Sequence, residues 1–323
     1  MSASHSWRSR PKQTWFHVRV LITGGNGFIG SHLADTMLRK SHSVVLMDQT
    51  FGSNTANLSC EKITGDVSDL NSFRDLPKNF DLIFHAAAVS RVEWGETDPE
   101  KCLRTNVIGT LNAVIWATGQ PTPPHLVLAS SREVYGNPKS VPVTEEDPRN
   151  PVSIYGISKA TAEDLIKHSA MTRSLKYTIV RLANVYGSTH DQPGRVIPIF
   201  VHKAMRNEPL ILNGGEQVLD FIHYQDIIDD LIRIFELADG PTCRNTTLNL
   251  ATGQGNSIHQ LAVLIRRLTN SNSTISTIPR REYDVKQFIG DDSKAQDILH
   301  HHSRTNLEKG LERYIAQVRQ EKH

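Results

Sequence analysis

The sequence has few cysteines, and this limits the classes of protein to which it can belong. Its 323 residues contain three, Cys60, Cys102 and Cys243, which lie far apart. An odd number of widely spaced cysteines is typical neither of a disulfide framework nor of a zinc site. We therefore expect reduced thiols in a cytoplasmic protein.

Long hydrophobic runs and an excess of charge are also missing. No apolar stretch reaches the roughly 20 residues of a membrane-spanning helix. The formal net charge is only +2, so we expect neither a nucleic-acid nor a membrane partner. The 15 histidines show no spacing typical of a metal site, and His300, His301 and His302 are expected in a polar loop. We therefore predict an ordinary globular protein without a metal.

The first 17 residues differ in composition from the rest. They contain no acid, carry Arg8, Arg10 and Lys12, and lack the apolar stretch of a secretory signal. We expect a frayed N-terminal tail over residues 1–17, with a contact arm on a partner subunit as the alternative.

A glycine cluster interrupts the first apolar run. Residues 18–30 read VRVLITGGNGFIG, with a helical pattern following. The glycines fit two patterns. Gly24, Gly27 and Gly30 form one, and Gly25, Gly27 and Gly30 form the other. Such a turn is sharp, leaves room for a pyrophosphate and lets the helix pack on the strand. The pattern predicts a strand, a phosphate-binding turn and a helix.

The start of that helix and the end of the next predicted strand indicate which ligand the turn holds. The amides of Gly27, Phe28 and Ile29 are expected to face phosphates, where the helix dipole favours negative charge. The strand 44–47 ends in Asp48. An acid there suits the paired hydroxyls of an adenosine ribose, which favours NAD over its 2′-phosphorylated form. A glycine-rich turn without a ligand is the alternative.

Two later strand ends carry residues suited to the same cofactor. Asp66 follows the predicted strand 61–64 and can bond an adenine amino group or, about equally well, cap the turn before Leu70. Ala86, Ala87 and Ala88 follow the predicted strand 81–85, and their small side chains let the backbone lie close to a flat cofactor.

Predicted strands and helices alternate as far as residue 186. The next strands are 125–129 and 176–181, and the helices are 31–39, 99–118 and 153–170. This alternation predicts an α/β fold with a Rossmann-type doubly wound parallel sheet. Helices 196–206, 226–237, 258–269 and 307–319 then alternate with the short extended pieces 209–212, 245–250 and 273–277. We expect a Rossmann domain over residues 18–186. A smaller, mixed α/β substrate-binding region over 187–323 is expected to cross back to it in part.

A possible catalytic group lies at the start of the helix 153–170. Tyr155 and Lys159 are four residues apart, so their side chains share one helix face. The free pKa of tyrosine is about 10, and two cations would lower it: the Lys159 ammonium and an oxidised nicotinamide. Tyr155 could then take a proton from a sugar hydroxyl, and Ser131, after a strand end, could bond the same hydroxyl.

The chain resembles the extended short-chain dehydrogenase/reductases, the nucleotide-sugar epimerase/dehydratase family. The matching stretches run in family order from Val18 to about Gly310. They are the segments 23–30, 65–67, 85–88, 105–110, 130–131 with 134–136, Tyr155 with Lys159, 184–187 and 220–223.

This resemblance implies roles for particular residues. It implies Ser131, Tyr155 and Lys159 as the catalytic triad. It also implies a tightly held NAD and a UDP-sugar as the most favoured substrate, with a homodimer formed through the helices 98–118 and 153–170. The cofactor residues that it implies are Gly24, Gly27, Phe28, Ile29, Gly30, Asp48, Asp66, Val67, Ala86, Ala87, Asn106, Tyr155 and Lys159. The substrate residues are Ser90, Ser131, Asn184, Arg195, Val196 and Arg281.

The residues after Ser131 bear on the reaction. Family dehydratases carry an aspartate and a glutamate there, whereas this chain has Arg132 and Glu133. Glu133 could act as a base at C5 of the sugar, or it could form a local ion pair. We expect a 4-epimerase with a transient 4-keto intermediate. The alternatives are a UDP-sugar decarboxylase or dehydratase that uses Glu133, and a non-catalytic NAD-binding protein.

One position departs from the family. The family usually has an arginine where this chain has Leu219, and that arginine grips the substrate diphosphate. Leucine cannot do so. Arg195, or Arg280 beside Arg281, could compensate; the substrate could carry a differently placed anion; or the substrate site could be degraded.

Overall fold

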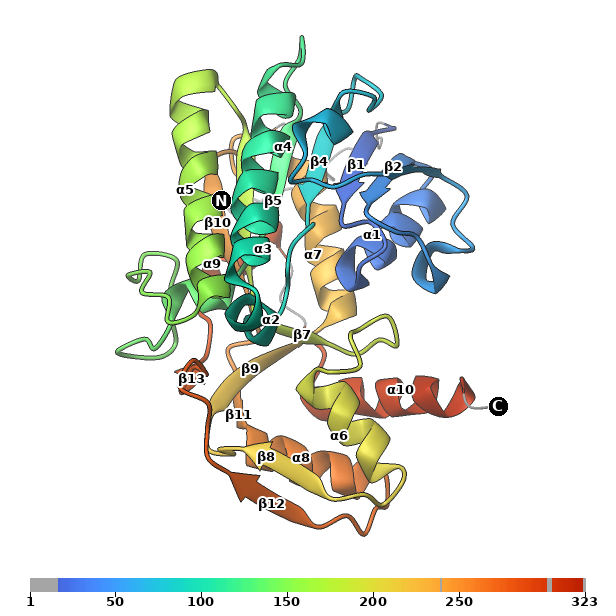
Figure 1. The fold of residues 1–323 in the computed structure, drawn as a ribbon, viewed down its shortest axis with the longest axis vertical. Coiled ribbons are helices and arrows are strands. Elements are labelled where there is room, and N and C mark those ends of the chain that lie inside the picture. Colours follow the sequence, from blue (N-terminus) through green and yellow to red (C-terminus); the bar gives the residue numbers. More distant parts are fainter. Residues whose placement is uncertain (1–16, 239, 301–303, 322–323) are drawn as a thin grey trace, which may run out of the picture.

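The computed structural model describes residues 17–238, 240–300 and 304–321. These residues form two regions, one above the other in Figure 1. The upper region is built on a seven-stranded sheet, and the lower region contains the smaller sheets. The expectation for the N-terminal tail falls outside the described residues except at His17, and so does most of the expected loop at residues 300–302.

The large sheet is parallel throughout, with the strand order β10-β6-β5-β4-β1-β2-β3. Its strands are β1 (Arg19–Thr23), β2 (Ser43–Asp48), β3 (Glu61–Thr64), β4 (Leu82–His85), β5 (His125–Ser131), β6 (Tyr177–Leu182) and β10 (Thr246–Leu250). The predicted Rossmann-type sheet is thereby confirmed. The strand order reverses between β1 and β4, and ligands of such sheets bind beyond the carboxyl ends of the strands at that point.

Helices cover both faces because successive strand residues point to opposite sides. In β1, Val20 and Ile22 join one apolar cluster, and Leu21 joins another. The first cluster includes side chains of α1 (Phe28–Arg39), α7 (Tyr224–Leu237) and α9 (Ser293–Leu299). The second includes side chains of α4 (Gly109–Thr118) and α5 (Ile154–Arg173). Strands buried on both faces are almost continuously apolar, as the sequence shows here.

The single helix expected over residues 99–118 is divided in the structure. It consists of α3 (Pro99–Leu103), a π-helical segment η3 (Arg104–Ile108) and α4. A short helix that the sequence did not indicate, α2 (Val92–Thr97), precedes it. The π-helical segment carries Asn106, whose side chain is bonded to the loop after β4. π-Helical turns within a helix are frequent at functional sites, and tertiary contacts rather than propensity favour this one.

The lower region has an apolar cluster of its own, which includes Phe200, Leu261 and Leu311. Its elements are β7 (Asn184–Tyr186), α6 (Val196–Ala204), β8 (Leu210–Asn213), β9 (Val218–His223), β11 (Gly255–Ser257), α8 (Ile258–Leu268), β12 (Ile275–Ile278), β13 (Gln287–Phe288) and α10 (Leu307–Gln320). Strand β9 pairs with β7, β11 and β13, and β8 pairs with β12. Strands β7, β9, β11 and β13 were not expected from the sequence. Three of them are only two or three residues long, which is too short for a clear alternating pattern.

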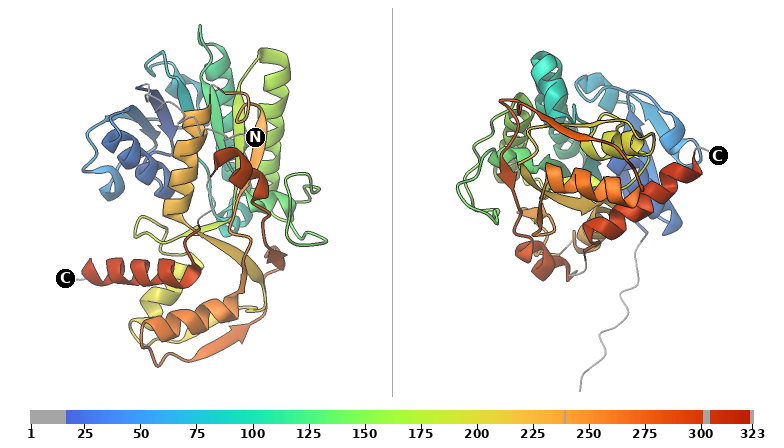
Figure 2. Two further views of the ribbon diagram at one scale, coloured as in Figure 1. Left: turned by 180° about the vertical axis from the view of Figure 1, so that it is seen from behind. Right: turned by 90° about the horizontal axis from the view of Figure 1, so that it is seen from below.

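The chain returns to the large sheet after residue 187. Strand β10 pairs with β6 at the edge of that sheet, and α7 and α9 pack on the face that is turned toward the viewer in Figure 2, left. Three short turns complete the structure: η1 (Ser53–Thr55), η2 (Leu70–Phe73) and η4 (Arg132–Tyr135). The last of these leads directly out of β5.

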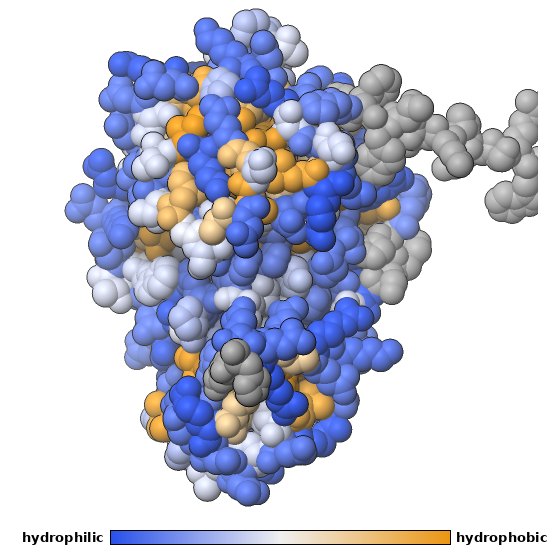
Figure 3. Space-filling model, turned by 90° about the vertical axis from the view of Figure 1, so that its right-hand side faces the viewer, coloured by the Kyte–Doolittle hydropathy of each residue, from blue (hydrophilic) through white to orange (hydrophobic). Residues whose placement is uncertain are grey.

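Polar side chains cover most of the face shown in Figure 3, where apolar residues gather in separate areas of the upper and lower parts. Within the described ranges, no helix is both long enough and apolar enough to cross a membrane.

Candidate active site

The turn after β1 passes very close to the chain that follows β4. Gly24 has a φ of +70°, in the left-handed region that favours glycine. A Cβ atom on Gly24 would lie 2.7 Å from the amide nitrogen of Ala87, and one on Gly30 would collide with the carbonyl oxygen of Gly24. Only glycine therefore allows the turn, the neighbouring loop and the start of α1 to approach so closely.

The backbone amides of this turn have different partners. The Gly27 amide donates a hydrogen bond to the Gly24 carbonyl oxygen at 3.0 Å, so it closes the turn and, contrary to expectation, does not face a phosphate. Phe28 and Ile29 form the first turn of α1, whose amides have no intrahelical acceptor. No side chain caps this helix in the described part of the chain. These two amides remain suited to an anion.

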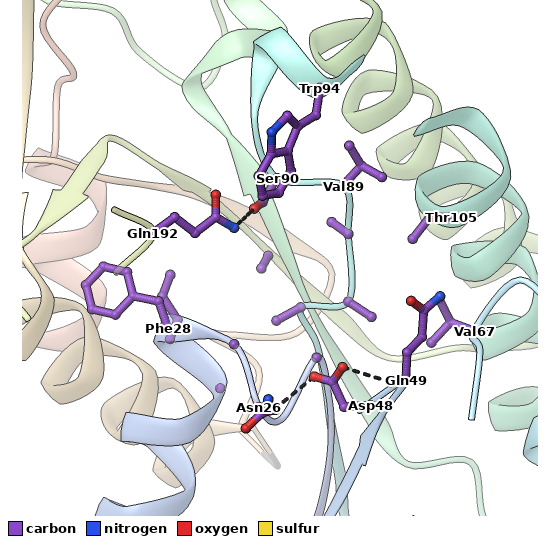
Figure 4. A pocket seen from close by; sticks show the side chains of 18 of the residues that line it. Asn26, Phe28, Asp48, Gln49, Val67, Val89, Ser90, Trp94, Thr105 and Gln192 are labelled. Atoms are coloured by element: carbon purple, nitrogen blue, oxygen red, sulfur yellow. Dashed lines mark hydrogen bonds between the residues drawn. The ribbon is translucent and has the colours of Figure 1, made fainter. Parts of the chain in front are cut away.

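Asp48 lies at the end of β2, beside the glycine turn. Its carboxylate accepts hydrogen bonds from the amides of Asn26, at 2.9 Å, and of Gln49, at 2.8 Å (Figure 4). Asp48 also lines the cavity described below. The acid therefore lies where a ribose of a dinucleotide is expected.

Asp66 is not among the residues that line that cavity, and its carboxylate accepts hydrogen bonds from the Ser68 amide at 2.8 Å and the Gln49 side chain at 3.0 Å. Its contact with an adenine stays a prediction. The alternative role as a cap is wrong, because Asp69 caps η2. The neighbouring Val67 does line the cavity, as implied by the family resemblance.

Asn106 is buried behind the loop that follows β4, and it too does not line the cavity. Its side chain accepts a hydrogen bond from the Val89 amide at 2.8 Å and donates to the Val89 carbonyl at 3.1 Å and to Ser158 at 2.8 Å. The side chain of Asn106 thus supports the loop that lines the cavity, and its contact with the cofactor stays a prediction. Asn106 holds the loop, and Ser90 on that loop accepts a hydrogen bond from Gln192 at 3.1 Å (Figure 4).

These elements enclose a cavity of about 430 Å³ at the carboxyl ends of the strands. Its walls come from the glycine turn, β2, the loop after β4, the start of α5 and the loop before α6 (Figure 4). The expected cofactor residues that line it are Gly24, Gly27, Phe28, Ile29, Gly30, Asp48, Val67, Ala86, Ala87, Tyr155 and Lys159.

Tyr155 and Lys159 project from the first turns of α5, and both are buried. The Lys159 Nζ donates a hydrogen bond to the carbonyl oxygen of Ala129 at 2.8 Å and lies 5.9 Å from the centre of the Tyr155 ring. Ser131 ends β5, and its hydroxyl accepts a hydrogen bond from the Glu133 amide at 3.2 Å. The structure thus brings together the three residues that the sequence pattern singled out.

Burial shifts the pKa values of Tyr155 and Lys159 in opposite directions. Burial raises the pKa of Tyr155 to about 12, although a hydrogen bond with Ser131 and the charge of Arg195 act in the opposite direction. Burial also lowers the pKa of Lys159 to about 8. In the protein chain alone, removing the phenolate from water outweighs the nearby positive charges. The acidic phenol is expected with a nicotinamide cation beside it, and it stays a prediction.

A second cavity, of about 400 Å³, shares Tyr155, Ser90 and Arg195 with the first. The expected substrate residues all line it: Ser90, Ser131, Asn184, Arg195, Val196 and Arg281. Glu133 lines it as well. Tyr155 therefore stands at the wall between a dinucleotide-sized cavity and a second polar cavity.

Four arginines and four carboxylates line the second cavity: Arg91, Arg132, Arg195 and Arg281, with Glu93, Glu133, Asp191 and Asp284. Each arginine lies within ion-pair distance of one of these acids. The pairs are Arg91–Glu93 at 2.9 Å, Arg132–Glu133 at 2.8 Å, Arg195–Asp191 at 3.2 Å and Arg281–Glu93 at 3.6 Å. The formal charges of the wall therefore balance.

Leu219 lines the second cavity from β9, where the family resemblance led us to expect an arginine. Arg280 does not line the cavity, because its guanidinium donates to the backbone carbonyls of Arg281 and Asp284. Arg280 is therefore not the compensating residue, whereas Arg195 and Arg281 both reach the cavity.

Comparison with known proteins agrees with this geometry. Residues 20–251 match the family model described as the NAD-dependent epimerase/dehydratase family. The chain belongs to this family. A relative, UDP-glucuronic acid decarboxylase 1 of Xenopus tropicalis, is 31% identical over 317 residues, which are 94% of this chain and 72% of that protein.

Two solved structures show the same fold over 94% of the chain. One is UDP-glucose 4-epimerase of Thermotoga maritima with UDP-glucose, with a TM-score of 0.87, 28% identity and all of that chain covered. The other is MoeE5 with UDP-glucose and NAD, with a TM-score of 0.86, 29% identity and again all of that chain covered. The family thus includes both epimerases and decarboxylases.

NAD is the cofactor of this family, and the residues present fit it. A side chain on Gly24 or Gly30 would collide with neighbouring backbone atoms, so only glycine keeps this turn. The first turn of α1 presents uncapped amides to the cavity. Asp48, which is expected at the ribose, and the expected alanines also line the cavity.

Sequence reasoning missed several residues of the site. Arg132 was noted only as a missing acid, and Trp94 and Gln192 were not singled out, yet all three line the cavities. Their positions depend on loops and short turns that carry no periodic signal. Among the described residues, no group of three or more His, Cys, Asp or Glu side chains is placed to hold a metal ion.

Proposed function

We propose that the protein is a nucleotide-sugar 4-epimerase that uses a transient 4-keto sugar. The observation that carries this proposal is the position of Tyr155, in the wall shared by the two cavities. A sugar carbon placed there would face the NAD cavity on one side and the Ser131 and Tyr155 hydroxyls on the other. NAD, when bound, supplies a hydride acceptor and a positive ring charge that favours the phenolate.

The side chains of the protein would then transfer the proton and stabilise the charges that form. Tyr155 would take the proton of the 4-hydroxyl as the carbon is oxidised. It would return this proton after the 4-keto sugar has rotated in the site. Ser131 would donate a hydrogen bond to the developing oxyanion. Lys159, fixed to Ala129 at 2.8 Å, would hold positive charge beside the phenol. An epimerase needs no further base, because the same proton and the same carbon are used in both directions.

A UDP-sugar is the substrate class that we propose. Relatives and structural neighbours named for UDP-sugars share the fold over nearly the whole chain. Asn184, Arg195, Val196 and Arg281 line the cavity beyond Tyr155, where the nucleotide diphosphate would lie.

A product analysis tests the proposal. The purified protein is incubated with UDP-glucose, UDP-N-acetylglucosamine and their uronic acids, and the products are followed by mass spectrometry and NMR. We expect an unchanged mass with inversion at C4. Loss of water or of carbon dioxide would instead establish the second candidate below.

The second candidate is a UDP-sugar decarboxylase or dehydratase that uses Glu133 as the C5 base. It is favoured by the burial of Glu133 in the substrate cavity, with one carboxylate oxygen unpaired among the described residues. A carboxylate of this kind can accept a proton from carbon. Burial raises the pKa of Glu133, which favours it as a base, and the charge of Arg132 opposes this rise. We place this candidate second because the chain has Arg132 in place of an acid.

The third candidate, a non-catalytic NAD-binding protein, rests on Leu219 alone. Absence of turnover with every nucleotide sugar, in protein that retains NAD, would support it.

The homodimer is also a proposal. Leu103, Ile108 and Ile157 are exposed apolar side chains on α3, η3 and α5, which lie side by side in Figure 1. Sedimentation equilibrium would show a species of twice the 36.2 kDa chain mass.

A further inference from the structure

The loop between β7 and α6 forms part of the wall of the cofactor cavity, and we call residues 188–195 the strap. The strap passes below α1 in the view of Figure 1. Three of its residues line the first cavity: Asp191, Gln192 and Arg195. A dinucleotide that fills this cavity would therefore be in contact with the strap as well as with the glycine turn.

One part of the strap is bonded to the chain that follows β4. The Gln192 side chain donates a hydrogen bond to the Ser90 hydroxyl at 3.1 Å (Figure 4). The Arg91 guanidinium donates to the carbonyl oxygen of Gly194 at 2.9 Å. Because Ser90 also lines the first cavity, these contacts join the strap to another wall of the same cavity.

The other part of the strap is bonded to α1 through two histidines. The Ser188 hydroxyl lies 2.7 Å from the His32 Nε2. The Ser31 hydroxyl lies 2.9 Å from the His190 Nδ1. The rings of His32 and His190 are stacked, with their centres 4.4 Å apart and an angle of 18° between their planes. Ser31 directly follows Gly30, so the strap is fastened beside the glycine turn.

The stacked pair requires uncharged rings. The Ser188 hydroxyl accepts a hydrogen bond from the His190 amide at 3.0 Å, which leaves its own proton to be donated to the His32 Nε2. A proton on that nitrogen would replace the acceptor by a donor. Two imidazolium rings 4.4 Å apart would also repel each other. Burial lowers the pKa of His32 to about 3 and also lowers the pKa of His190, so both rings are neutral at pH 7.

The surroundings of the pair indicate which ring takes up a proton first. His223, at the end of β9, is a third neutral histidine beside His32, because burial lowers its pKa to about 4. The other titratable or charged side chains around these histidines are Asp35 and Arg39 of α1, Tyr224 and Asp226 of α7, Arg313 of α10, and Glu321. Asp35 and Glu321 oppose the fall of the His190 pKa, so His190 is protonated first as the pH falls.

We propose that the strap retains NAD in the first cavity, and that protonation of the His32–His190 pair opens the strap and releases the cofactor. The proposal depends on the NAD site alone, so it holds for either reaction considered above. In the open strap both rings would be in water, with an ordinary pKa of about 6.5. Because the closed strap binds fewer protons, acid favours the open strap below about pH 6.5.

NAD release from the NAD-containing protein tests the proposal. The protein is diluted into buffer at pH 7.5 or pH 5.0, and the free NAD is separated by rapid filtration and measured enzymatically. We expect release to be about tenfold or more faster at pH 5.0, because at least one ring gains a proton on opening. Far-UV circular dichroism should be the same at both pH values. Release that accompanies a loss of this signal would overturn the proposal.

Isosteric variants separate the charge of the pair from its packing. In the double variant His32→Gln and His190→Asn, the amide nitrogen of each new side chain can replace the bonded ring nitrogen, but neither side chain titrates. We expect the release rates at the two pH values to differ by less than about threefold. His190→Asn alone, at a half-buried position, should already lower the ratio of the two rates by about threefold or more.

His168→Gln is the matched control, because it removes an exposed histidine on α5. It should keep the ratio of the unchanged protein. Asp191 is a competing explanation, since burial raises the pKa of this acid and the charge of Arg195 opposes the rise. A double variant that keeps the full pH dependence would assign the effect to Asp191 or another group, and the proposal would be wrong.

Gln192→Ala tests the strap independently of the histidines. It removes the bond to Ser90 and leaves the stacked pair intact. We expect NAD to be released faster at both pH values, by about threefold or more, with the ratio of the two rates unchanged. An unchanged release rate would show that the strap does not retain NAD. The product analysis above tests the epimerase separately, since a protein without C4 inversion can still show acid-dependent NAD release.

Discussion

The ammonium group of Lys159 is hydrogen-bonded to the carbonyl oxygen of Ala129, at 2.8 Å, so α5 is tied to β5 two residues before Ser131. The lysine thus has a backbone partner of its own in addition to its place near the phenol of Tyr155. A buried charge with a single neutral partner is costly, and this cost should be visible in the stability of the protein.

The pH dependence of unfolding should reveal the cost. The Lys159 pKa is about 8 in the folded protein, below its ordinary value of 10.5. Between these values the unfolded chain binds more protons, so the free energy of unfolding rises with pH across this window. At pH 7 the buried charge costs on the order of 3 kcal/mol, less the contribution of its hydrogen bond. We expect Lys159→Met to be about 2 kcal/mol more stable at pH 7, and the gain to shrink by pH 9.5.

Urea unfolding at the two pH values measures this difference. Lys139→Met, at an exposed position, should change stability little at either pH. If Lys159→Met were destabilised equally at pH 7 and pH 9.5, packing rather than charge would account for its effect.

Replacement of Tyr155 by phenylalanine should separate chemistry from cofactor binding. The variant loses the proton acceptor but keeps the glycine turn and Lys159, so turnover should fall below about 1% while NAD remains bound. NAD content is read from the absorbance of protein denatured after purification, and turnover from C4 inversion by NMR. Activity well above this level would argue against Tyr155 as the base.

Leu219→Arg should add a positive charge to the wall of the second cavity, in which the formal charges of the arginines and the acids balance. Because the arginines already there are paired with acids, a further guanidinium should tighten UDP binding by about tenfold. Calorimetry with UDP measures the change, and Leu219→Gln controls for polarity without charge. Equal affinities for the two variants would place the diphosphate away from β9.

A methyl group on Gly30 should disrupt the turn that holds NAD. Its Cβ would collide with the Gly24 carbonyl oxygen, and backbone at this point cannot move without opening the turn. We expect Gly30→Ala to lose bound NAD and to unfold at a lower temperature. Gly52→Ala is the control, because its Cβ would meet nothing closer than 3.8 Å. Normal NAD content in Gly30→Ala would contradict the conclusion that the glycine turn holds NAD.

Much of the fold could be predicted because it depends on local patterns. The strands of the large sheet are buried on both faces and read as apolar runs, and the glycine turn has a spacing that few other structures require. The pairing of β10 with β6 joins residues about 70 apart, and no local pattern encodes it. The π-helical segment at Asn106 was missed for a similar reason, since its cause is a hydrogen bond to a distant loop.

The amino-acid order alone determined the identity and spacing of the reactive groups: a serine after a strand, a tyrosine and a lysine one helical turn apart, and an acid at the end of the second strand. Only the tertiary structure decided their environment. Burial raised the pKa of Tyr155 and lowered that of Lys159, and contacts with β7 and β13 fixed the orientation of the Arg132 side chain. Desolvation and orientation depend on what the rest of the chain packs around a group, and a linear pattern does not contain that information.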